Sequence, residues 1–571
     1  MLIALAALTC AVYSNTLLNG FTIDDEFVYA DNHFTKHLSN LPRLFDSAYF
    51  QYSNEASYRP VCTLTYFLDT AMWNGWSGGP HLTNLMLFIL TVMAVFGFFQ
   101  VITKDQAAAF LGAALFAIHP VHTEVINNIS FREDLLVGLF VPVAWLCYKR
   151  SEEGKPLLWM ILSWLAYFLA LFSKENAMTF LVLAALLAWT ESEGHWRSFL
   201  TRRKLFFAAG LVVLTIFFAL VRFHWMRFEG EGHTPQLGGS IWATVISDVK
   251  ILAHYVKLFF FPYPLLAQYP ASMYSSQIDV RFVVSVGSLF LMVAFVAYFR
   301  RAKFFLLGVF WWFVSLAPVA NIQPIFNPMA ERYLFLPSIG LCLWAGWAIA
   351  RSIQTRARIV VIGLTIVVAI ALSAITFARN PNWSDNLTLW QATVQTIPDD
   401  PKVLAELATE HFNRGNYNEA IANAKAALRL KEAAASNIDP VPIYLCMGSA
   451  YYMLRETDLA LEYLKKAEAL LPSRFDIDTA VYRNLGLIYD DRNDLKIARR
   501  YYKRASAIDP YRTDLWRKIA FCELRLGNRS HAEKSWNTAR SLDPALISFE
   551  EIEMLYKKSR QQPAQTDQPP K

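Results

Sequence analysis

The chain has 571 residues, of which 55% are hydrophobic, 15% aromatic and only 18% charged. So low a charged fraction excludes an ordinary soluble protein of this length. The net charge of +6 arises largely from basic residues between hydrophobic runs, so it gives no reason to expect a nucleic-acid partner. Because the hydrophobic runs are concentrated in residues 1–380, the sequence predicts a membrane domain followed by a water-soluble domain.

About eleven hydrophobic runs approach the length that a membrane-spanning helix needs. We expect an uncleaved first span rather than a secretory signal, because the first run lacks a basic start and a cleavage site. A further stretch, Ile251–Pro264, contains charged residues and prolines and is predicted to be a re-entrant or interfacial segment. The eleven runs begin near Leu2, Leu82, Ala107, Leu135, Pro156, Ala177, Leu205, Val283, Phe304, Tyr333 and Ile359.

The distribution of basic residues predicts the orientation of the bundle. Short loops of one parity are rich in lysine and arginine, whereas the loops of the other parity are longer and poorer in these residues. The positive-inside rule places the basic loops in the cytoplasm. The 19–82 loop and the C-terminal domain then lie on the opposite side, provided that Ile251–Pro264 does not cross. The basic residues are Lys149, Arg150, Arg202, Arg203, Lys204, Arg300, Arg301, Lys303, Arg351, Arg356 and Arg358.

An acidic pair, Asp24 and Asp25, follows the first hydrophobic run directly. Carboxylates close to a membrane face lose water and acquire shifted pKa values, which acid–base catalysis requires. A solvated loop can also carry two acids, so the pair alone does not decide between these interpretations. The predicted topology places further polar clusters on the same side, and three of them mix acidic and basic residues. Long ionisable side chains commonly anchor helix ends, but three mixed clusters exceed what anchoring needs.

One of these clusters contains His119, His122 and Glu124, which could form a metal-binding triad. Pro120 interrupts the regular helix that such spacing requires, so a hydrogen-bonding role is simpler and a divalent metal is not expected. The six cysteines show no CxxC spacing, which gives no support for a zinc site or a disulfide framework.

Two other clusters offer cations for a phosphate. Arginine can fork around phosphate oxygens and lysine supplies a point charge, so Lys174 or Arg332 could hold such a group. Alternatively, Lys174 with Glu175 and Arg332 with Glu331 form ion pairs that tie helix ends together. Both interpretations can hold, because a phosphate site needs cations that are themselves positioned.

From Pro401 the sequence repeats with small residues at regular positions and a proline closing each unit, which is the tetratricopeptide pattern. Four units predict a stacked α-solenoid, with Ile547–Lys557 as a capping helix. The Pro/Gln-rich residues 559–571 are predicted to be a disordered tail. Such repeats form a concave groove that binds peptides or proteins, so a docking platform is the simplest function for this domain alone.

Taken together, these motifs resemble the transmembrane and tetratricopeptide-repeat O-mannosyltransferases, which belong to the GT-C class of glycosyltransferases. The resemblance covers nearly the whole chain in the same order. It rests on the acidic pair, Tyr58-Arg59-Pro60, His81-Leu-Thr-Asn84, the His119–Glu124 run, Arg132-Glu-Asp-Leu-Leu136, Ser173-Lys-Glu175, Ala330-Glu-Arg-Tyr-Leu-Phe-Leu-Pro337, Arg379-Asn-Pro-Asn-Trp383 and the repeats.

The resemblance implies an all-α protein with a polytopic GT-C-type bundle of about eleven spans followed by the solenoid. It implies a catalytic domain at 1–380, a connecting segment at 381–400 and repeats with their cap at 401–558. The donor would be a sugar, mannose or another hexose, on polyprenyl phosphate, and no cofactor is expected. The acceptor would be a hydroxyl, such as a protein Ser/Thr bound through the repeats. Asp24 or Asp25 would act as the base of an inverting single displacement. The implied donor-phosphate and substrate-binding residues are Arg59, His119, His122, Glu124, Arg132, Asp134, Lys174, Glu175, Glu331 and Arg332.

The chain departs from the family pattern at Phe131, where members often carry glycine, and in its shorter repeat array. Compact loops suggest a bacterial protein, with the acidic pair and the repeats in the periplasm and the bundle in the inner membrane lipid. Two alternatives stay open: sugar transfer to an envelope glycan or lipid, and a non-catalytic membrane scaffold that recruits partners through its repeats. The sequence indicates no nucleic-acid partner.

Overall fold

The computed structural model describes residues 1–561 except 33, 54, 56, 193–194, 227–238, 271–272, 274–276, 326, 434–437 and 474. Residues 562–571, most of the predicted disordered tail, lie outside the described residues. Within the described part of the chain the regular elements are helices, and no strand occurs. The predicted all-α class is therefore confirmed. The chain forms two compact units, Met1–Ile397 and Pro398–Lys571.

Helices cover all of the hydrophobic runs predicted in the first unit. Among the described residues, five stretches are long and apolar enough to cross a membrane: α4, α11 with the turn that follows it, α13, α15 with the turn before it, and α16 with the turn after it. A sixth span exists if the bent pair of α5 and residues 120–127 counts as one, with a bend of 55° beside Pro120. The structure therefore supports a membrane protein, while the count of about eleven spans stays a prediction. The helices are α1 (Leu2–Tyr13), α4 (Gly78–Thr103), α5 (Gln106–Ile118), α7 (Arg132–Ser151), α8 (Pro156–Leu171), α9 (Phe180–Glu191), α10 (Trp196–Phe199), α11 (Arg202–Leu220), α12 (Ile241–Phe260), α13 (Val280–Tyr298), α14 (Lys303–Leu316), α15 (Phe335–Ile353) and α16 (Arg358–Arg379).

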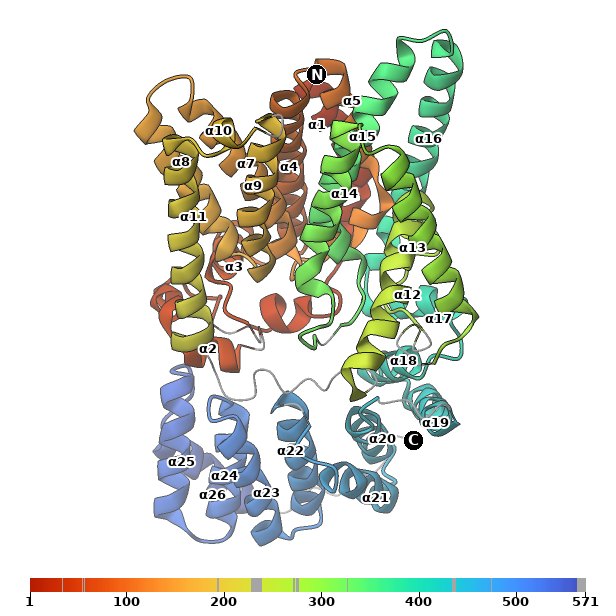
Figure 1. The fold of residues 1–571 in the computed structure, drawn as a ribbon. Coiled ribbons are helices and arrows are strands. Elements are labelled where there is room, and N and C mark those ends of the chain that lie inside the picture. Colours follow the sequence, from red (N-terminus) through yellow and green to blue (C-terminus); the bar gives the residue numbers. More distant parts are fainter. Residues whose placement is uncertain are drawn as a thin grey trace. The chain divides into compact units, whose positions relative to one another are not determined.

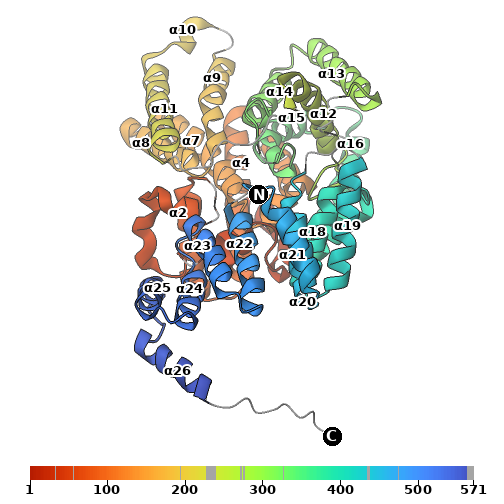
Figure 2. The same cartoon turned by 90° about the horizontal axis from the view of Figure 1, so that it is seen from below.

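The first unit consists of two groups of helices joined by α4. Figure 2 shows α7, α8, α9 and α11 on one side and α12 to α16 on the other, with α4 between them. The contact between α5 and α15 is very close, because a Cβ atom added to Gly112 would lie only 2.7 Å from the carbonyl oxygen of Cys342. Small residues allow such close approach of helices in membranes, where packing rather than hydrophobicity drives their association.

Short elements form one end of the first unit. In Figure 1, α2 (Ser47–Tyr52) lies at the lower end, whereas α10 and the turn between α15 and α16 lie at the upper end. Helix α2, which belongs to the 19–82 loop, and two of the loops predicted to be cytoplasmic therefore lie at opposite ends. The other short elements are η1 (Ser14–Leu18), η2 (Glu26–Ala30), η3 (Leu38–Phe45), α3 (Pro60–Trp73), η4 (Pro120–His122), α6 (Thr123–Asn127), η5 (Glu175–Thr179), η6 (Val221–Trp225), η9 (Ala317–Val319), η10 (Glu331–Leu334), η11 (Asn380–Trp383) and α17 (Asn386–Thr396).

The stretch predicted to be re-entrant is the second half of a longer helix. Helix α12 has 20 residues and begins at Ile241, and the chain leaves the helix before Pro262. Twenty helical residues span about 30 Å, which matches the hydrocarbon thickness of a bilayer. Its length thus permits a crossing, although α12 is not among the five helices that satisfy both length and hydropathy. The re-entrant assignment stays a prediction.

The segment after α16 belongs to the first unit. Trp383 is fully buried and Trp390 nearly so. The carbonyl oxygen of Ser384 accepts a hydrogen bond from the backbone N–H of Gly20 at 2.8 Å. Residues 381–397 therefore pack beside the loop that carries the acidic pair.

The described residues of the second unit form four successive helix pairs and one further helix. Small residues permit close packing within the pairs, since a Cβ atom added to Gly448 would lie 2.6 Å from the Leu464 side chain. Alanines at the repeated positions, such as Ala460 and Ala498, are fully buried. The helices are α18 (Pro401–Asn413), α19 (Tyr417–Ala433), α20 (Val441–Met453), α21 (Thr457–Glu468), α22 (Phe475–Asp491), α23 (Leu495–Ile508), α24 (Thr513–Arg525), α25 (Arg529–Leu542) and α26 (Phe549–Gln561).

Candidate active site

The two carboxyl groups of the acidic pair have different surroundings. Asp25 is fully buried, and its oxygens accept backbone N–H groups of Ser130 at 2.7 Å and Thr22 at 3.3 Å. The side chain of Asp24 is exposed. Asp25 therefore holds the first loop against the segment that precedes α7, and Asp24 is the carboxylate that solvent or a substrate can reach.

Burial raises the pKa of Asp25 to about 7, although the hydrogen bonds that its carboxylate accepts from backbone N–H groups lower this pKa. The negative charge of Asp24 raises this pKa further. Near neutral pH the buried carboxyl of the pair can thus exist in both protonation states.

The loop is held in a conformation that few residues adopt. Ile23 has a φ of 52°, in the left-handed region that β-branched residues avoid. Its backbone N–H donates to the side-chain oxygen of Asn386 at 2.6 Å, and the amide of Asn386 donates to Glu26 at 3.2 Å. Strained backbone of this kind persists only where the surroundings fix it, and it concentrates at functional sites.

A row of asparagines, which the sequence analysis did not assign, supports the base of the loop. Asn19 donates to Asn127 at 2.8 Å, Asn127 donates to Asn380 at 2.9 Å, and Asn380 donates to Asn15 at 2.7 Å. Beside them, Asn128 donates to the carbonyl of Thr22 at 2.9 Å. The signal in the sequence was the Arg379–Trp383 motif, because its Asn380 connects the first loop to α6 through Asn127.

The predicted residues Arg59, Asp134, Lys174 and Glu175 lie together in one ionic network with Glu133 and Arg222. Lys174 contacts Glu133 at 2.9 Å and Asp134 at 2.5 Å. Glu175 contacts Arg59 at 3.0 Å and Arg222 at 3.2 Å, and Arg59 also pairs with Glu133. The ion pair expected between the chain neighbours Lys174 and Glu175 is therefore wrong, because each pairs with residues of other motifs.

Arg332 lies beside this network and also pairs outside its own motif. Glu124 accepts the backbone N–H of Arg332 at 2.8 Å and pairs with its guanidinium. The guanidinium lies over the rings of Phe131 and Tyr333, 4.1 and 5.0 Å from their centroids, and the Lys174 ammonium lies 5.8 Å from the Tyr333 centroid. Lys174 and Arg332 thus share one aromatic ring.

Glu331 faces away from Arg332, so an ion pair between these neighbours is also wrong. Its carboxylate pairs with Arg379 at 2.9 Å and accepts the hydroxyl of Tyr269 at 3.0 Å and the backbone N–H of Leu266 at 2.6 Å. Arg379 and Tyr269 were not predicted as site residues.

Arg132 lies apart from the other predicted cations. It is fully buried, pairs with Asp69 at 2.6 Å, and donates to Asn84 at 2.6 Å and to Thr65 at 2.8 Å. Its guanidinium therefore fixes α7 to α3 and α4 rather than joining Lys174 and Arg332.

The three candidate metal ligands have separate partners. His119 donates to the carbonyl of Phe259 at 2.9 Å, and His122 lies 2.9 Å from both the carbonyl of Phe116 and the hydroxyl of Ser338. Glu124 binds Arg332. Among the residues that the structure describes, no group of three or more His, Cys, Asp or Glu side chains could hold a metal ion.

A second acid with a raised pKa, the half-buried Glu55, lies at the edge of the ionic network. It accepts the hydroxyls of Tyr49 and Thr63, both at 2.5 Å. Burial raises its pKa to about 7, against the opposing effects of these hydrogen bonds and of Arg59. Nothing in its sequence surroundings marked this residue.

Comparison with known proteins identifies the relatives of this chain. It is 24% identical to a protein O-mannosyl-transferase of Caenorhabditis elegans, over 72% of this chain and 59% of that protein. It is 21% identical to human protein O-mannosyl-transferase TMTC3, over 94% of this chain and 67% of that protein. With Drosophila melanogaster protein O-mannosyl-transferase Tmtc1 the identity is 31%, over 32% of this chain and 22% of that protein.

The homologues of this chain are protein O-mannosyltransferases of the TMTC family. The chain spans 59% to 67% of the length of the first two relatives. A tetratricopeptide repeat family model matches residues 480–512, which confirms the predicted repeat type. The chain is also similar to the crystal structure of MamA, with 22% identity and a TM-score of 0.23, over 30% of this chain and 89% of that one.

Proposed function

We propose that this chain is a membrane glycosyltransferase that moves a sugar, mannose or another hexose, from polyprenyl phosphate to a hydroxyl of a protein Ser or Thr. The observation that carries the proposal is the acidic loop, in which the fully buried Asp25 is hydrogen-bonded to Ser130 and leaves the exposed Asp24 at the surface. The names of the homologues support the transfer of mannose. A GT-C-type bundle of about eleven spans forms part of the same proposal.

In this mechanism Asp24 is the general base and Asp25 is a positioning residue. The acceptor oxygen attacks the anomeric carbon, the bond from that carbon to the phosphate oxygen breaks, and the phosphate leaves with the electron pair. Asp24 takes the proton of the acceptor hydroxyl. A single displacement inverts the anomeric centre, and the leaving phosphate needs no proton if cations stabilise its charge.

The cations best placed for this task are Arg332 and Lys174, which share the ring of Tyr333. A chain of contacts connects them to the acidic pair: Asp25 accepts the N–H of Ser130, and the next residue, Phe131, stacks on Arg332. A guanidinium has five N–H donors, so Arg332 can hold Glu124 and a phosphate oxygen together. A divalent metal is not required.

The remaining parts of the proposal concern the acceptor and the location. The repeats would bind the acceptor polypeptide and raise its concentration near the acidic pair. The basic loops support an orientation with the acidic pair and the repeats on the non-cytoplasmic side, which is the periplasm for a bacterial inner-membrane protein. The candidate membrane spans and the cations Lys174 and Arg332 support the polyprenyl-phosphate carrier that the family resemblance implies.

The test is transfer by the purified full-length chain in lipid nanodiscs. Polyprenyl-phosphate mannose serves as donor and a Ser/Thr-rich polypeptide as acceptor, and the anomeric configuration of the product is read by NMR. We expect an inverted linkage with the wild type and with Asp31→Asn, an exposed acid of the same loop, and at least a hundredfold slower transfer with Asp24→Asn.

Other outcomes favour the alternatives. Transfer to envelope glycan or lipid but to no polypeptide identifies the acceptor as one of these molecules. Absence of transfer to every acceptor, with partner proteins retained on the repeats, identifies a scaffold.

A further inference from the structure

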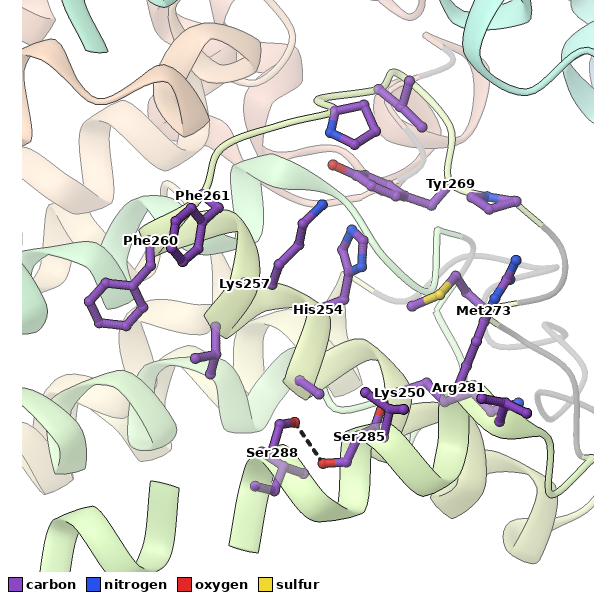
Figure 3. A pocket seen from close by; sticks show the side chains of 18 of the residues that line it. Lys250, His254, Lys257, Phe260, Phe261, Tyr269, Met273, Arg281, Ser285 and Ser288 are labelled. Carbon is purple, nitrogen blue, oxygen red and sulfur yellow. Dashed lines mark hydrogen bonds between the residues drawn. The ribbon is translucent and has the colours of Figure 1, made fainter. Parts of the chain in front are cut away.

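A large cavity lies between α12 and α13 in the first unit. Its volume is about 720 Å³, which is within the range of ligand-binding sites, about 300–1,000 Å³. The segment after α12 closes it with Leu266, Tyr269 and Met273, and the end of α17 adds Ile397. Figure 3 shows these helices and the side chains between them.

The lysine, arginine and histidine side chains of the lining are all basic, and the lysines and the arginine give it a positive charge. Lys250, His254, Lys257 and Arg281 line the cavity, and the described lining residues include neither Asp nor Glu. Lys250 pairs with Asp279 at 3.1 Å, which lies outside the lining, and Lys257 donates to the carbonyl of Tyr263. These positive groups make the cavity favourable for an anion.

Two of the four basic lining residues, His254 and Lys257, lie together beside Tyr269 and define the basic end of the cavity. Figure 3 shows His254 and Lys257 side by side, both directed toward Tyr269. The Nε2 atom of His254 is buried and has no hydrogen-bond partner within the described part of the protein. An unpaired buried polar atom is costly, so a ligand that hydrogen-bonds to it gains affinity.

The rest of the lining is apolar and opens outward. Phe260, Phe261, Val280 and Val284 line the cavity and are 51%, 71%, 78% and 64% exposed. Helix α13 itself is a candidate membrane span that is almost entirely exposed. In a bilayer these side chains face lipid, so a hydrocarbon chain can enter the cavity sideways.

The basic end of the cavity lies against the candidate active site. Tyr269 and Leu266 line the cavity and donate to Glu331 at 3.0 and 2.6 Å. Glu331 precedes Arg332, the proposed transition-state cation. A phosphate bound at this end would therefore lie beside Tyr269, whose hydroxyl donates to the residue that precedes Arg332 in the chain.

We propose that this cavity binds the polyprenyl phosphate carrier, with the isoprenoid chain along α13 and the phosphate beside Lys257 and His254. This proposal rests on the proposed function, because it identifies where that donor binds. An apolar cavity with a cationic end matches a long hydrocarbon chain that ends in one phosphate. A sugar or a free phosphate would leave the apolar wall unoccupied, and a neutral lipid would bring no negative charge to the basic side chains of the lining.

The experiment measures binding without requiring transfer. The purified full-length chain in nanodiscs is titrated with fluorescent geranylgeranyl phosphate, with geranylgeraniol and phosphatidylglycerol as competitors. Leu289→Trp fills the cavity and Lys257→Glu reverses one charge, while Leu291→Trp changes an exposed residue of α13 that does not line it. Thermal unfolding of each variant confirms that it is folded.

We expect Leu289→Trp and Lys257→Glu each to weaken binding at least tenfold and Leu291→Trp to change it less than twofold. Geranylgeraniol should compete at least tenfold more weakly than geranylgeranyl phosphate. Equal affinity of the two cavity variants and the wild type would overturn the proposal, as would equal competition by phosphatidylglycerol, which would identify a general lipid site.

The two proposals fail in different ways. If transfer occurs but binding ignores the cavity variants, the carrier binds elsewhere and the enzymatic function stands. If binding depends on the cavity but no acceptor receives sugar, the cavity site stands and the proposed transfer is wrong.

Discussion

Neutralising the two carboxyls of the acidic pair should produce two different defects. Asp24 is exposed, so Asp24→Asn removes a charge at the surface of the loop. Loss of a general base lowers rates by about 10²- to 10⁴-fold. We therefore expect at least hundredfold slower transfer with an unchanged free energy of unfolding.

Asp25 is predicted to affect stability first. Asp25→Ala would leave the buried N–H groups of Ser130 and Thr22 without their acceptor. An unsatisfied buried donor costs about 1–3 kcal/mol, so the two together cost about 2–6 kcal/mol. Asp25→Asn should cost less, because the remaining side-chain oxygen still accepts one of the two N–H groups. The amide nitrogen cannot accept the other N–H group. Activity should fall because the loop that holds Asp24 loses its anchor.

The assay combines two measurements on the same preparations in nanodiscs. Thermal unfolding followed by tryptophan fluorescence reports stability, and initial rates with polyprenyl-phosphate mannose report catalysis. Asp31→Asn is the matched control for a charge lost from the loop. The reasoning is refuted if Asp24→Asn transfers at the wild-type rate while Asp25→Asn is stable and inactive, since Asp25 would then be the base.

Three further predictions concern the surroundings of the pair. Arg332→Lys should lower kcat at least tenfold because the bidentate fork is lost, and Phe131→Ala should lower it less, by removing one cation–π contact of about 0.5–2 kcal/mol; a kcat unchanged in both would contradict this. The pKa of Glu55 is raised by burial from 4.5 to about 7, so the stability that its proton gives is present at pH 4.5 and lost as the pH rises through 7. Glu55→Gln should flatten the fall of Tm across that range, and an unchanged slope would argue against the shift. Deleting residues 398–571 should spare transfer to a small soluble acceptor but abolish transfer to the polypeptide, whereas equal polypeptide transfer would assign the repeats another role.

The sequence predicted which polar residues gather but not how they pair. Lys174 and Asp134 are 40 residues apart, and Arg332 and Glu124 are 208 apart. Adjacent residues of a helix or an extended segment point in different directions, so neighbours in one motif seldom form the pair. The convergence of the motifs could be predicted because they lie in alternate loops, which the predicted topology places on the same side of the membrane. Which residues pair with one another depends on how the helices pack.

The number of membrane spans is harder to predict from the sequence than the existence of a membrane domain. Helices α9 and α14 have 12 and 14 residues, fewer than the roughly 20 that an untilted span needs. Hydropathy locates such segments, but neighbouring turns and the tilt of each helix decide whether they cross. Of the asparagine row only Asn380 lay in a recognised motif, and its partners could not be predicted because amide networks depend on contacts between distant loops.

The pairing of the cations bears on where a donor binds and where its charge is stabilised. In the described network the cations Arg59, Lys174 and Arg222 face the carboxylates of Glu133, Asp134 and Glu175, and Arg332 faces Glu124. Burial requires this, because an unpaired buried charge costs several kcal/mol. Because the network is nearly neutral, it attracts the phosphate of the bound donor only weakly. Its cations can still turn toward the negative charge that develops on the phosphate as the bond from the anomeric carbon to the phosphate oxygen breaks. The basic end of the α12–α13 cavity, whose lining has no described acid, is better suited to ground-state binding. If the cavity binds the donor and the ionic network stabilises the leaving phosphate, the network stabilises the transition state more than the bound substrate. A chemical step is accelerated only by interactions that are stronger in the transition state than in the bound substrate.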